Sequence, residues 1–193
     1  MSNTDPYFKK NIPFRYRGHD LSFNISQVLF SSQDIDVGTK HLLKTMVDEG
    51  FENYGKVLDL GSGYGPIGIS LKVADPKSEM HMVDKDALAL KYTEENAKLN
   101  GTSDIKVYGS LGYDDVSDKD FDLIVSNIPA KVGDEVLAHM LKDARYYLKP
   151  GGKVVVVVID AIGDYVAEVL KDPNIKILAC LKSIEESVHW FQT

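Results

Sequence analysis

Short apolar runs alternate with segments of helical spacing along most of this chain. Seven runs have the length and composition of buried strands: residues 56–60, 79–84, 105–108, 121–126, 154–159, 175–181 and 187–192. Apolar positions three and four residues apart predict helices over residues 66–74, 87–100, 136–148 and 163–171. Strands that alternate with helices predict an α/β fold with a mostly parallel sheet and helices on both faces.

The first fifty residues follow a different pattern. Residues 14–27 predict a hairpin that turns near Gly18, and residues 38–49 predict a helix. We expect this hairpin and helix to cover the end of the sheet that binds a ligand.

Composition and length add few constraints. A chain of 193 residues with 44% hydrophobic and 26% charged residues fits one compact globular domain. The polar first ten residues and the short apolar run at 154–159 predict neither an export signal nor a membrane span, so a cytoplasmic protein is expected. Cys180 is the only cysteine, which excludes an intrachain disulfide, and the five histidines share no metal-ligand spacing, so no metal is expected.

The charge distribution leaves two interpretations open for the start of the chain. A net charge of −7 argues against nucleic-acid binding over the whole surface. In residues 1–20, however, basic side chains outnumber acidic ones and interleave with aromatic side chains. This pattern suits contact with RNA phosphates and bases, and it equally suits an amphipathic hairpin that covers the core.

A glycine-rich loop, residues 59–65 (DLGSGYG), stands between a predicted strand and a predicted helix. Its glycines let a ligand approach the backbone closely, but they also match the dinucleotide fingerprint of dehydrogenases. Asp84, at the end of the next strand, suits the two hydroxyls of a ribose. Asp59 suits the ammonium of a methionyl group and would repel a pyrophosphate, which favours S-adenosylmethionine as the ligand.

A second motif, residues 126–130 (SNIPA), follows the fourth predicted strand. The side-chain oxygen of Asn127 and a neighbouring carbonyl can accept both hydrogens of an exocyclic or amide NH₂ and turn the nitrogen lone pair toward a methyl donor. The alternative is an asparagine that caps an ordinary turn between strand and loop.

With these motifs in this order, the chain resembles class I S-adenosylmethionine-dependent methyltransferases. It is most similar to the methyltransferase small-domain family, which includes bacterial ribosomal RNA guanine-N2 methyltransferases. The resemblance covers about residues 14–192 and rests on six sequence features: 28–31 (VLFS), 36–39 (DVGT), 57–65, Asp84, 126–130 and 148–152.

The resemblance implies a Rossmann-like fold, with a seven-stranded, mostly parallel sheet, an antiparallel last strand and an N-terminal hairpin and helix cap. It divides a single compact domain into residues 1–50, a substrate cap, and residues 51–193, the methyltransferase portion. Two departures from the family pattern stand out. Ile128 and Ala130 replace a proline and an aromatic residue, and Leu111 stands where relatives place an acid near the adenine.

The predicted site residues fall into three groups. The catalytic group is Asn127, Ile128 and Pro129. The cofactor group is Asp59, Gly61, Gly63, Gly65, Asp84, Ser110, Leu111 and Asn127, with the adenine held by the Ser110 side chain or the Leu111 backbone amide. The substrate group is Phe14, Arg15, Tyr16, Arg17, Phe30 and Ala130.

The sequence therefore predicts an S-adenosylmethionine-dependent N-methyltransferase. The expected substrate is an exocyclic amine of RNA, guanine N2 in ribosomal RNA, and the expected state is a monomer or homodimer. One alternative is a protein-glutamine N-methyltransferase, whose substrate amide offers the same two hydrogens. A nicotinamide dehydrogenase and a non-catalytic adenosine-binding protein are the others.

Overall fold

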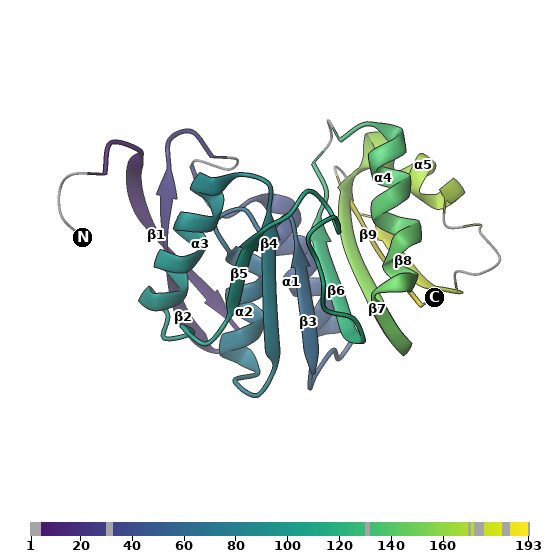
Figure 1. Ribbon diagram of the computed structural model, residues 1–193, viewed down its shortest axis with the longest axis horizontal. Helices are drawn as coiled ribbons and strands as arrows, with labels where there is room; N and C mark the ends of the chain where they lie inside the picture. Colours follow the sequence, from purple (N-terminus) through teal and green to yellow (C-terminus); the bar gives the residue numbers. More distant parts are fainter. Residues whose placement is uncertain are drawn as a thin grey trace.

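The protein is a three-layer α/β structure with a separate hairpin at one side (Figure 1). The computed structural model describes residues 5–29, 33–129, 132–169, 171, 176–182 and 186–192. The strands of the central sheet are β3 (Lys56–Leu60), β4 (Glu79–Asp84), β5 (Lys106–Gly109), β6 (Phe121–Asn127), β7 (Leu148–Ile159), β8 (Lys176–Lys182) and β9 (Glu186–Gln192). They lie in the order β5-β4-β3-β6-β7-β9-β8.

All the strand pairs from β5 to β7 are parallel, and β9 runs antiparallel to both β7 and β8. This arrangement confirms the predicted fold, including the antiparallel last strand. The helices are α1 (Val37–Asp48), α2 (Pro66–Ala74), α3 (Ala87–Leu99), α4 (Asp134–Lys142), a short 3₁₀ helix η1 (Asp143–Tyr146) and α5 (Asp160–Val169).

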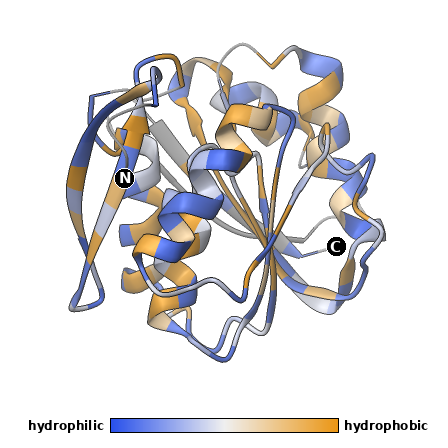
Figure 2. Cartoon of the chain, turned by 60° about the vertical axis from the view of Figure 1, so that its left-hand side comes forward, coloured by the Kyte–Doolittle hydropathy of each residue, from blue (hydrophilic) through white to orange (hydrophobic). Residues whose placement is uncertain are grey.

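Both faces of the sheet are buried, which explains the continuous apolar runs in the sequence. In β7, Val155 and Val157 pack with α1, α2 and α3, whereas Val154, Val156 and Val158 pack with α4 and α5. Figure 2 shows the apolar strands between these two layers of helices. Among the described residues, no helix is long and apolar enough to cross a membrane.

Two segments near the end of α4 differ from the sequence prediction. Residues 136–148 do not form one helix, because α4 ends at Lys142, η1 follows, and Leu148 already belongs to β7. The predicted turn at residues 149–152 is an irregular start of β7, where Gly151 has a φ of 83° and the register with β6 shifts.

The hairpin consists of β1 (Phe8–Tyr16) and β2 (His19–Ser26) and lies outside the helices (Figure 2). Two asparagines of α3 hold its β2 strand. The Asn96 side chain accepts from Asn24 N at 2.7 Å and donates to Asn24 O at 3.1 Å, and Asn100 bonds Ser22 N and O at 2.9 and 2.8 Å. The two amides thus replace a neighbouring strand along the free edge of β2.

The hairpin turn, at Arg17 and Gly18, lies beside the amino end of β3. The Tyr16 hydroxyl is 3.2 Å from the Tyr54 hydroxyl, and Arg17 donates to the backbone oxygen of Phe51. The carboxyl ends of the parallel strands are at the opposite edge of the sheet. The expectation that the whole hairpin covers the ligand-binding end is therefore wrong for its turn, because these bonds hold the turn at the other edge.

We predict that Asn96→Ala lowers the free energy of unfolding by about 2–4 kcal/mol, because it leaves buried backbone groups of β2 without partners. Asn96 is fully buried and also donates to Tyr64 O at 2.8 Å. Urea unfolding followed by circular dichroism measures the change. Asn100→Ala is the matched control and should cost less, since water can reach its half-buried position. Equal losses in the two variants would contradict the argument.

Candidate functional site

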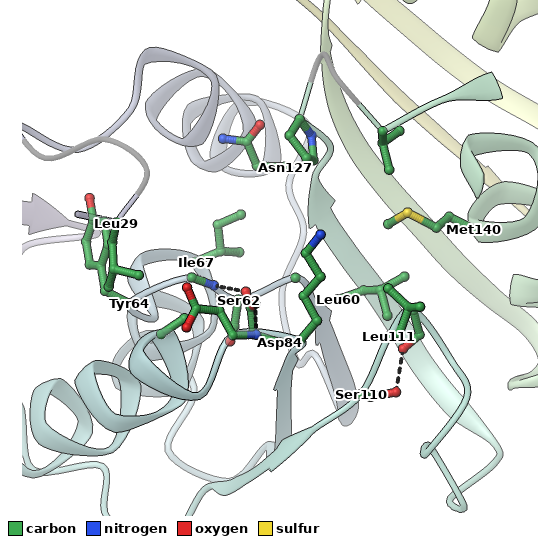
Figure 3. Close-up of a pocket in the computed structure, with 18 of the residues that line it drawn as sticks. Leu29, Leu60, Ser62, Tyr64, Ile67, Asp84, Ser110, Leu111, Asn127 and Met140 are labelled. Carbon is green, nitrogen blue, oxygen red and sulfur yellow. Dashed lines mark hydrogen bonds between the residues drawn. The ribbon is translucent and has the colours of Figure 1, made fainter. Parts of the chain in front are cut away.

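A pocket of about 330 Å³ opens at the carboxyl ends of β3, β4 and β6 (Figure 3). Its walls come from the glycine loop after β3, from the end of β4, from the turn after β5 and from the end of β6. The start of α1 and the inner side of α4 close it. Parallel strands leave such a crevice at their carboxyl ends, where adjacent crossovers diverge.

The glycine loop presents its backbone to the pocket. Gly61 and Gly63 have φ values of 77° and 60°, and a Cβ atom on either would meet nothing within 4 Å, so both face open space. Gly65 is the N-cap of α2, with a φ of 93°, and does not line the pocket. A Cβ there would lie 2.7 Å from Ile69 Cδ1, so Gly65 permits close packing that shapes the loop.

Asp84 directs its carboxylate toward the pocket from the end of β4 (Figure 3). Its Oδ2 accepts from Gly63 N and its Oδ1 from Asp86 N, both at 2.9 Å. These bonds fix the carboxylate and still leave lone pairs on both oxygens for hydroxyl donors.

Asp59 lies behind the loop rather than in the pocket wall. It is 1% exposed, and its Oδ2 accepts from Gly68 N at 2.8 Å. Its Oδ1 is buried with no hydrogen-bond partner among the described residues. Burial raises the pKa of Asp59 to about 7, the bond from Gly68 opposes this shift, and the nearby charge of Asp84 adds to it. An unpartnered buried carboxylate oxygen suits a cationic donor near the loop.

Asn127 ends β6, and its amide is held from the side of α1. Its Nδ2 donates to Asp36 Oδ2 at 2.7 Å and to Thr39 Oγ1 at 3.1 Å, and all three residues line the pocket. Figure 3 shows Asn127 across the pocket from Asp84 and Ser110. Residues 36–39 carry part of the family resemblance, but the sequence alone did not indicate a role for them in the site. The available signal was an aspartate directly before a predicted helix, which is typical of an N-cap.

Ile128 does not face the pocket, so its predicted catalytic role has no support in the geometry. Its side chain is 2% exposed within the core, and its N–H donates to Val157 O at 3.0 Å. A proline at this position would lose that bond. The departure from the family pattern therefore extends the pairing of β6 with β7, while Pro129 still lines the pocket.

The geometry of the turn after β5 distinguishes between the two groups predicted to bind the adenine, the Ser110 side chain and the Leu111 backbone amide. The Ser110 hydroxyl donates to Gly112 O at 2.8 Å and accepts from Asp115 N at 3.1 Å, so it stabilises the turn. The Leu111 side chain is exposed and lines the pocket. The Leu111 backbone amide is thus the better candidate of the two.

The predicted substrate residues of the hairpin are not brought to the pocket. Tyr16 is buried against Tyr54, Arg17 is bound to Phe51, and Phe14 packs 6.4 Å from the Phe23 ring. Arg15 pairs with Asp20 across the hairpin turn. Tyr16 and Arg17 lie toward the amino edge of the sheet, where the hairpin turn docks, and none of the four residues lines the pocket. Phe30 and Ala130 lie outside the described residues.

A family model described as methyltransferase small domain matches residues 20–172. The chain belongs to this family. Membership in the methyltransferase small-domain family confirms the predicted enzyme class, a methyltransferase, and its S-adenosylmethionine cofactor.

Two relatives illustrate the range of the family. The uncharacterized protein YbxB of Bacillus subtilis (strain 168) is 32% identical over 151 residues, which are 78% of this chain and 74% of that protein. Ribosomal RNA small subunit methyltransferase C of Mannheimia succiniciproducens is 36% identical over 133 residues, 67% of this chain and 38% of that protein. The chain therefore spans well under half the length of that ribosomal RNA methyltransferase.

Solved structures agree on the fold of this methyltransferase small domain. The T. thermophilus 16S rRNA N2 methyltransferase (RsmC), in complex with AdoMet and guanosine, is 21% identical with a TM-score of 0.77, over 98% of this chain and 51% of that one. A ribosomal protein L11 methylase from Lactobacillus delbrueckii subsp. bulgaricus is 22% identical with a TM-score of 0.72. The match covers 86% of this chain and 88% of that one. At these identities the likeness shows the shared fold.

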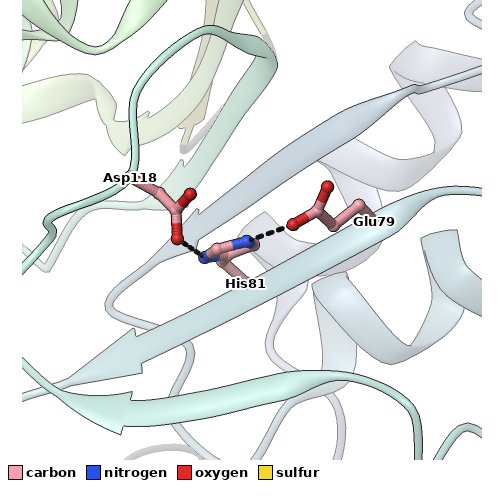
Figure 4. Close-up of side chains that lie close together, drawn as sticks. All are labelled: Glu79, His81 and Asp118. Atoms are coloured by element: carbon pink, nitrogen blue, oxygen red, sulfur yellow. Dashed lines mark hydrogen bonds and ion pairs between the residues drawn. The ribbon is translucent and has the colours of Figure 1, made fainter.

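A second cluster of polar groups lies away from the pocket, at the amino end of β4 (Figure 4). His81 is fully buried between Glu79, which is 3.1 Å from Nε2, and Asp118, which is 3.7 Å from Nδ1. The carboxylates flank opposite ring nitrogens, and each is paired with a lysine, Lys106 or Lys56. This geometry is that of an ion-pair network rather than a chelating site. The expectation of no metal stays a prediction.

His81 and Glu79 should each contribute stability that is lost as the pH falls, in two separate pH ranges. Burial lowers the pKa of His81, so between pH 6.5 and its folded pKa the unfolded chain binds more protons and stability drops as pH falls. The hydrogen bond from Lys106 lowers the pKa of Glu79 to about 2, so its contribution is lost at still lower pH.

We expect His81→Gln to remove the loss of stability that His81 causes between pH 7 and pH 5, because glutamine does not titrate, so the difference in stability between the variant and the unaltered protein should change with pH. Thermal unfolding across this range measures the slope. His19→Gln is the matched control, since it removes an exposed imidazole in the hairpin. A His81→Gln profile as steep as that of the unaltered protein would exclude His81 as the source of this loss.

Proposed function

We propose that the chain transfers a methyl group from S-adenosylmethionine to an exocyclic NH₂ group, guanine N2 of ribosomal RNA. The observation that carries the proposal is the orientation of Asn127. Both hydrogens of its amide are already donated, to Asp36 and to Thr39. Its carbonyl oxygen is thus the remaining hydrogen-bonding atom of the side chain. Such a group favours a substrate that donates N–H over one that only accepts.

The residues of the pocket fit S-adenosylmethionine. The open backbone at Gly61 and Gly63 admits the methionyl part, and the fixed carboxylate of Asp84 suits the ribose hydroxyls. The Leu111 backbone amide suits an acceptor nitrogen of the adenine. Asp59 Oδ1 and the buried hydroxyl of Ser62 lack partners among the described residues, which suits a polar group bound at the loop.

The bound cofactor supplies a methyl group on a sulfonium, which makes it electrophilic. The chain contributes orientation. Asn127 Oδ1 and a backbone carbonyl of the turn accept the two amine hydrogens, so that the nitrogen lone pair points toward the methyl carbon. With the cofactor bound, the S–CH₃ bond would break as the N–CH₃ bond forms, and the methylated nitrogen would then release a proton to water. Alignment of this kind can supply roughly 7–11 kcal/mol of a barrier.

The choice of RNA as substrate is supported by the ribosomal RNA methyltransferases among the relatives and by the mouth of the pocket. Lys85 is exposed at the pocket edge and pairs with no carboxylate in the described part of the chain, so it is available to a phosphate. Leu111 and Val136 line the pocket with exposed apolar side chains, which suit the face of a base. The hairpin residues 14–17 have no part in this contact, because none of them lines the pocket.

We predict that Gly63→Val abolishes S-adenosylmethionine binding, because the side chain would enter the space that the methionyl part needs. Calorimetry measures the affinity. Gly101→Val is the matched control: Gly101 has a φ of 73° and open space around its Cβ, so it shares the backbone strain, but it lies at the end of α3 outside the pocket. Unchanged affinity in a folded Gly63→Val variant would refute the proposed cofactor position.

We predict that Asn127→Ala lowers turnover by about 100-fold or more, an effect typical of removing a preorganised polar group at a reacting centre. Affinity for S-adenosylmethionine should change little, because Asn127 is proposed to contact the amine. Transfer of a labelled methyl group to a small-subunit ribosomal RNA transcript, with parallel calorimetry, separates the two effects. A fully active Asn127→Ala enzyme would overturn the proposed function.

A further inference from the structure

The start of α1 meets the end of β6 through one side chain. Asp36 is the N-cap of α1, and its Oδ2 accepts from Thr39 N at 3.3 Å. The same oxygen accepts from Asn127 Nδ2 at 2.7 Å, and Thr39 Oγ1 accepts from that nitrogen at 3.1 Å. Two hydrogen bonds beside the pocket thus join residues that are 91 and 88 positions apart in the chain, and a third closes the cap within α1.

A primary amide needs such partners to have one orientation. Rotation about its last torsion exchanges the oxygen and the nitrogen in nearly the same space, so packing alone barely distinguishes the two arrangements. A carboxylate only accepts hydrogen bonds. If Asn127 were flipped, its carbonyl oxygen would face Asp36 Oδ2 in place of the NH₂ group, and two acceptors would repel each other. Asp36 therefore selects the orientation in which Nδ2 faces α1.

The surroundings strengthen this selection. Thr39 is 3% exposed and Asp36 is half-buried, so water competes weakly for these bonds. The neighbouring ammonium of Lys40 is bound to Asp34 at 2.7 Å, and no basic side chain among the described residues pairs with Asp36. The carboxylate charge is thus directed at the amide, and a charge-assisted bond of this kind also polarises the carbonyl oxygen on the other side.

We propose that Asp36 and Thr39 are positioning residues for methyl transfer: they hold the Asn127 amide so that its oxygen accepts from the substrate amine. This inference rests on the proposed function of Asn127. It makes the first turn of α1 part of the catalytic apparatus, although neither residue touches the reacting atoms.

The first test needs no substrate. In the ¹H–¹⁵N NMR spectrum of the full chain, the side-chain NH₂ pair of Asn127, assigned by its absence in Asn127→Ala, should show a hydrogen shifted downfield by the bond to a carboxylate. Asp36→Ser should move this signal toward that of an exposed amide. Serine keeps the N-cap of α1 but is too short to reach Asn127. An unmoved signal in a folded Asp36→Ser variant would overturn the inference.

The second test is kinetic, with a small-subunit ribosomal RNA transcript and labelled S-adenosylmethionine. Asp36→Ser should lower kcat by about 10- to 100-fold, the range for partners that orient a functional ligand, with the KM for S-adenosylmethionine unchanged. Asp36→Asn should be intermediate, because its amide oxygen can still accept from both donors. Thr39→Val should lower kcat as well, whereas Thr39→Ser, which keeps the hydroxyl, should not.

The outcomes separate the two claims. If Asn127→Ala is inactive while Asp36→Ser and Thr39→Val keep full turnover, the positioning inference fails and the proposed function stands. If Asn127→Ala is fully active, the proposed function fails. If Asp36→Ser does not fold, Thr39→Val and its serine control decide the question, since valine matches the shape of threonine.

Discussion

Burial of the parallel sheet on both faces is the constraint on which the rest of the structure depends. Each parallel strand must return through a crossover, and the helices of those crossovers cover alternate residues such as Val155 and Val156 on opposite faces. All the parallel strands therefore end at one edge. The loops that leave this edge diverge, and the pocket lies between them, lined by backbone at Gly63 and by the fixed carboxylate of Asp84.

The segment before β3 completes this pocket and also stabilises the domain. The hairpin is fixed through side chains of α3, because Asn96 and Asn100 pair with the backbone of β2. The chain then returns to the carboxyl edge, where Asp36 begins α1 and binds Asn127. One carboxylate thus caps a helix and orients the amide that we assign to the substrate amine. The stability of α1 and the orientation of Asn127 thus depend on the same residue.

Much of the fold was predictable because it depends on local pattern. The strands at residues 56–60 and 79–84 were predicted at their observed bounds, since buried parallel strands are short apolar runs with turn residues on either side. The pocket position followed from the glycine loop and from Asp84, since both stand at the carboxyl ends of such strands. Family membership supports the cofactor that these residues suggested.

The sequence-based predictions that the structure does not support depend mainly on contacts between residues far apart in the chain. The basic and aromatic pattern at residues 14–17 gave no indication that the hairpin turn would dock beside Tyr54, because that depends on side-chain bonds across 34 and 38 positions. For the same reason, the sequence did not predict the hydrogen bond between Asp36 and Asn127. Ile128 was placed in the catalytic group by its neighbours in the motif, whereas strand alternation sends its side chain into the core. Which residues face one site together becomes known only from the packing that places their helices and strands side by side.

The central claim is methylation of an exocyclic amine in ribosomal RNA, and nucleoside mass spectrometry of RNA from cells with and without the protein tests it most directly. Our account predicts that N2-methylguanosine in ribosomal RNA decreases when the protein is absent. It should return with the unaltered gene and not with the Asn127→Ala gene. An unchanged set of RNA nucleosides, together with loss of a methylated glutamine from a cellular protein, would contradict it.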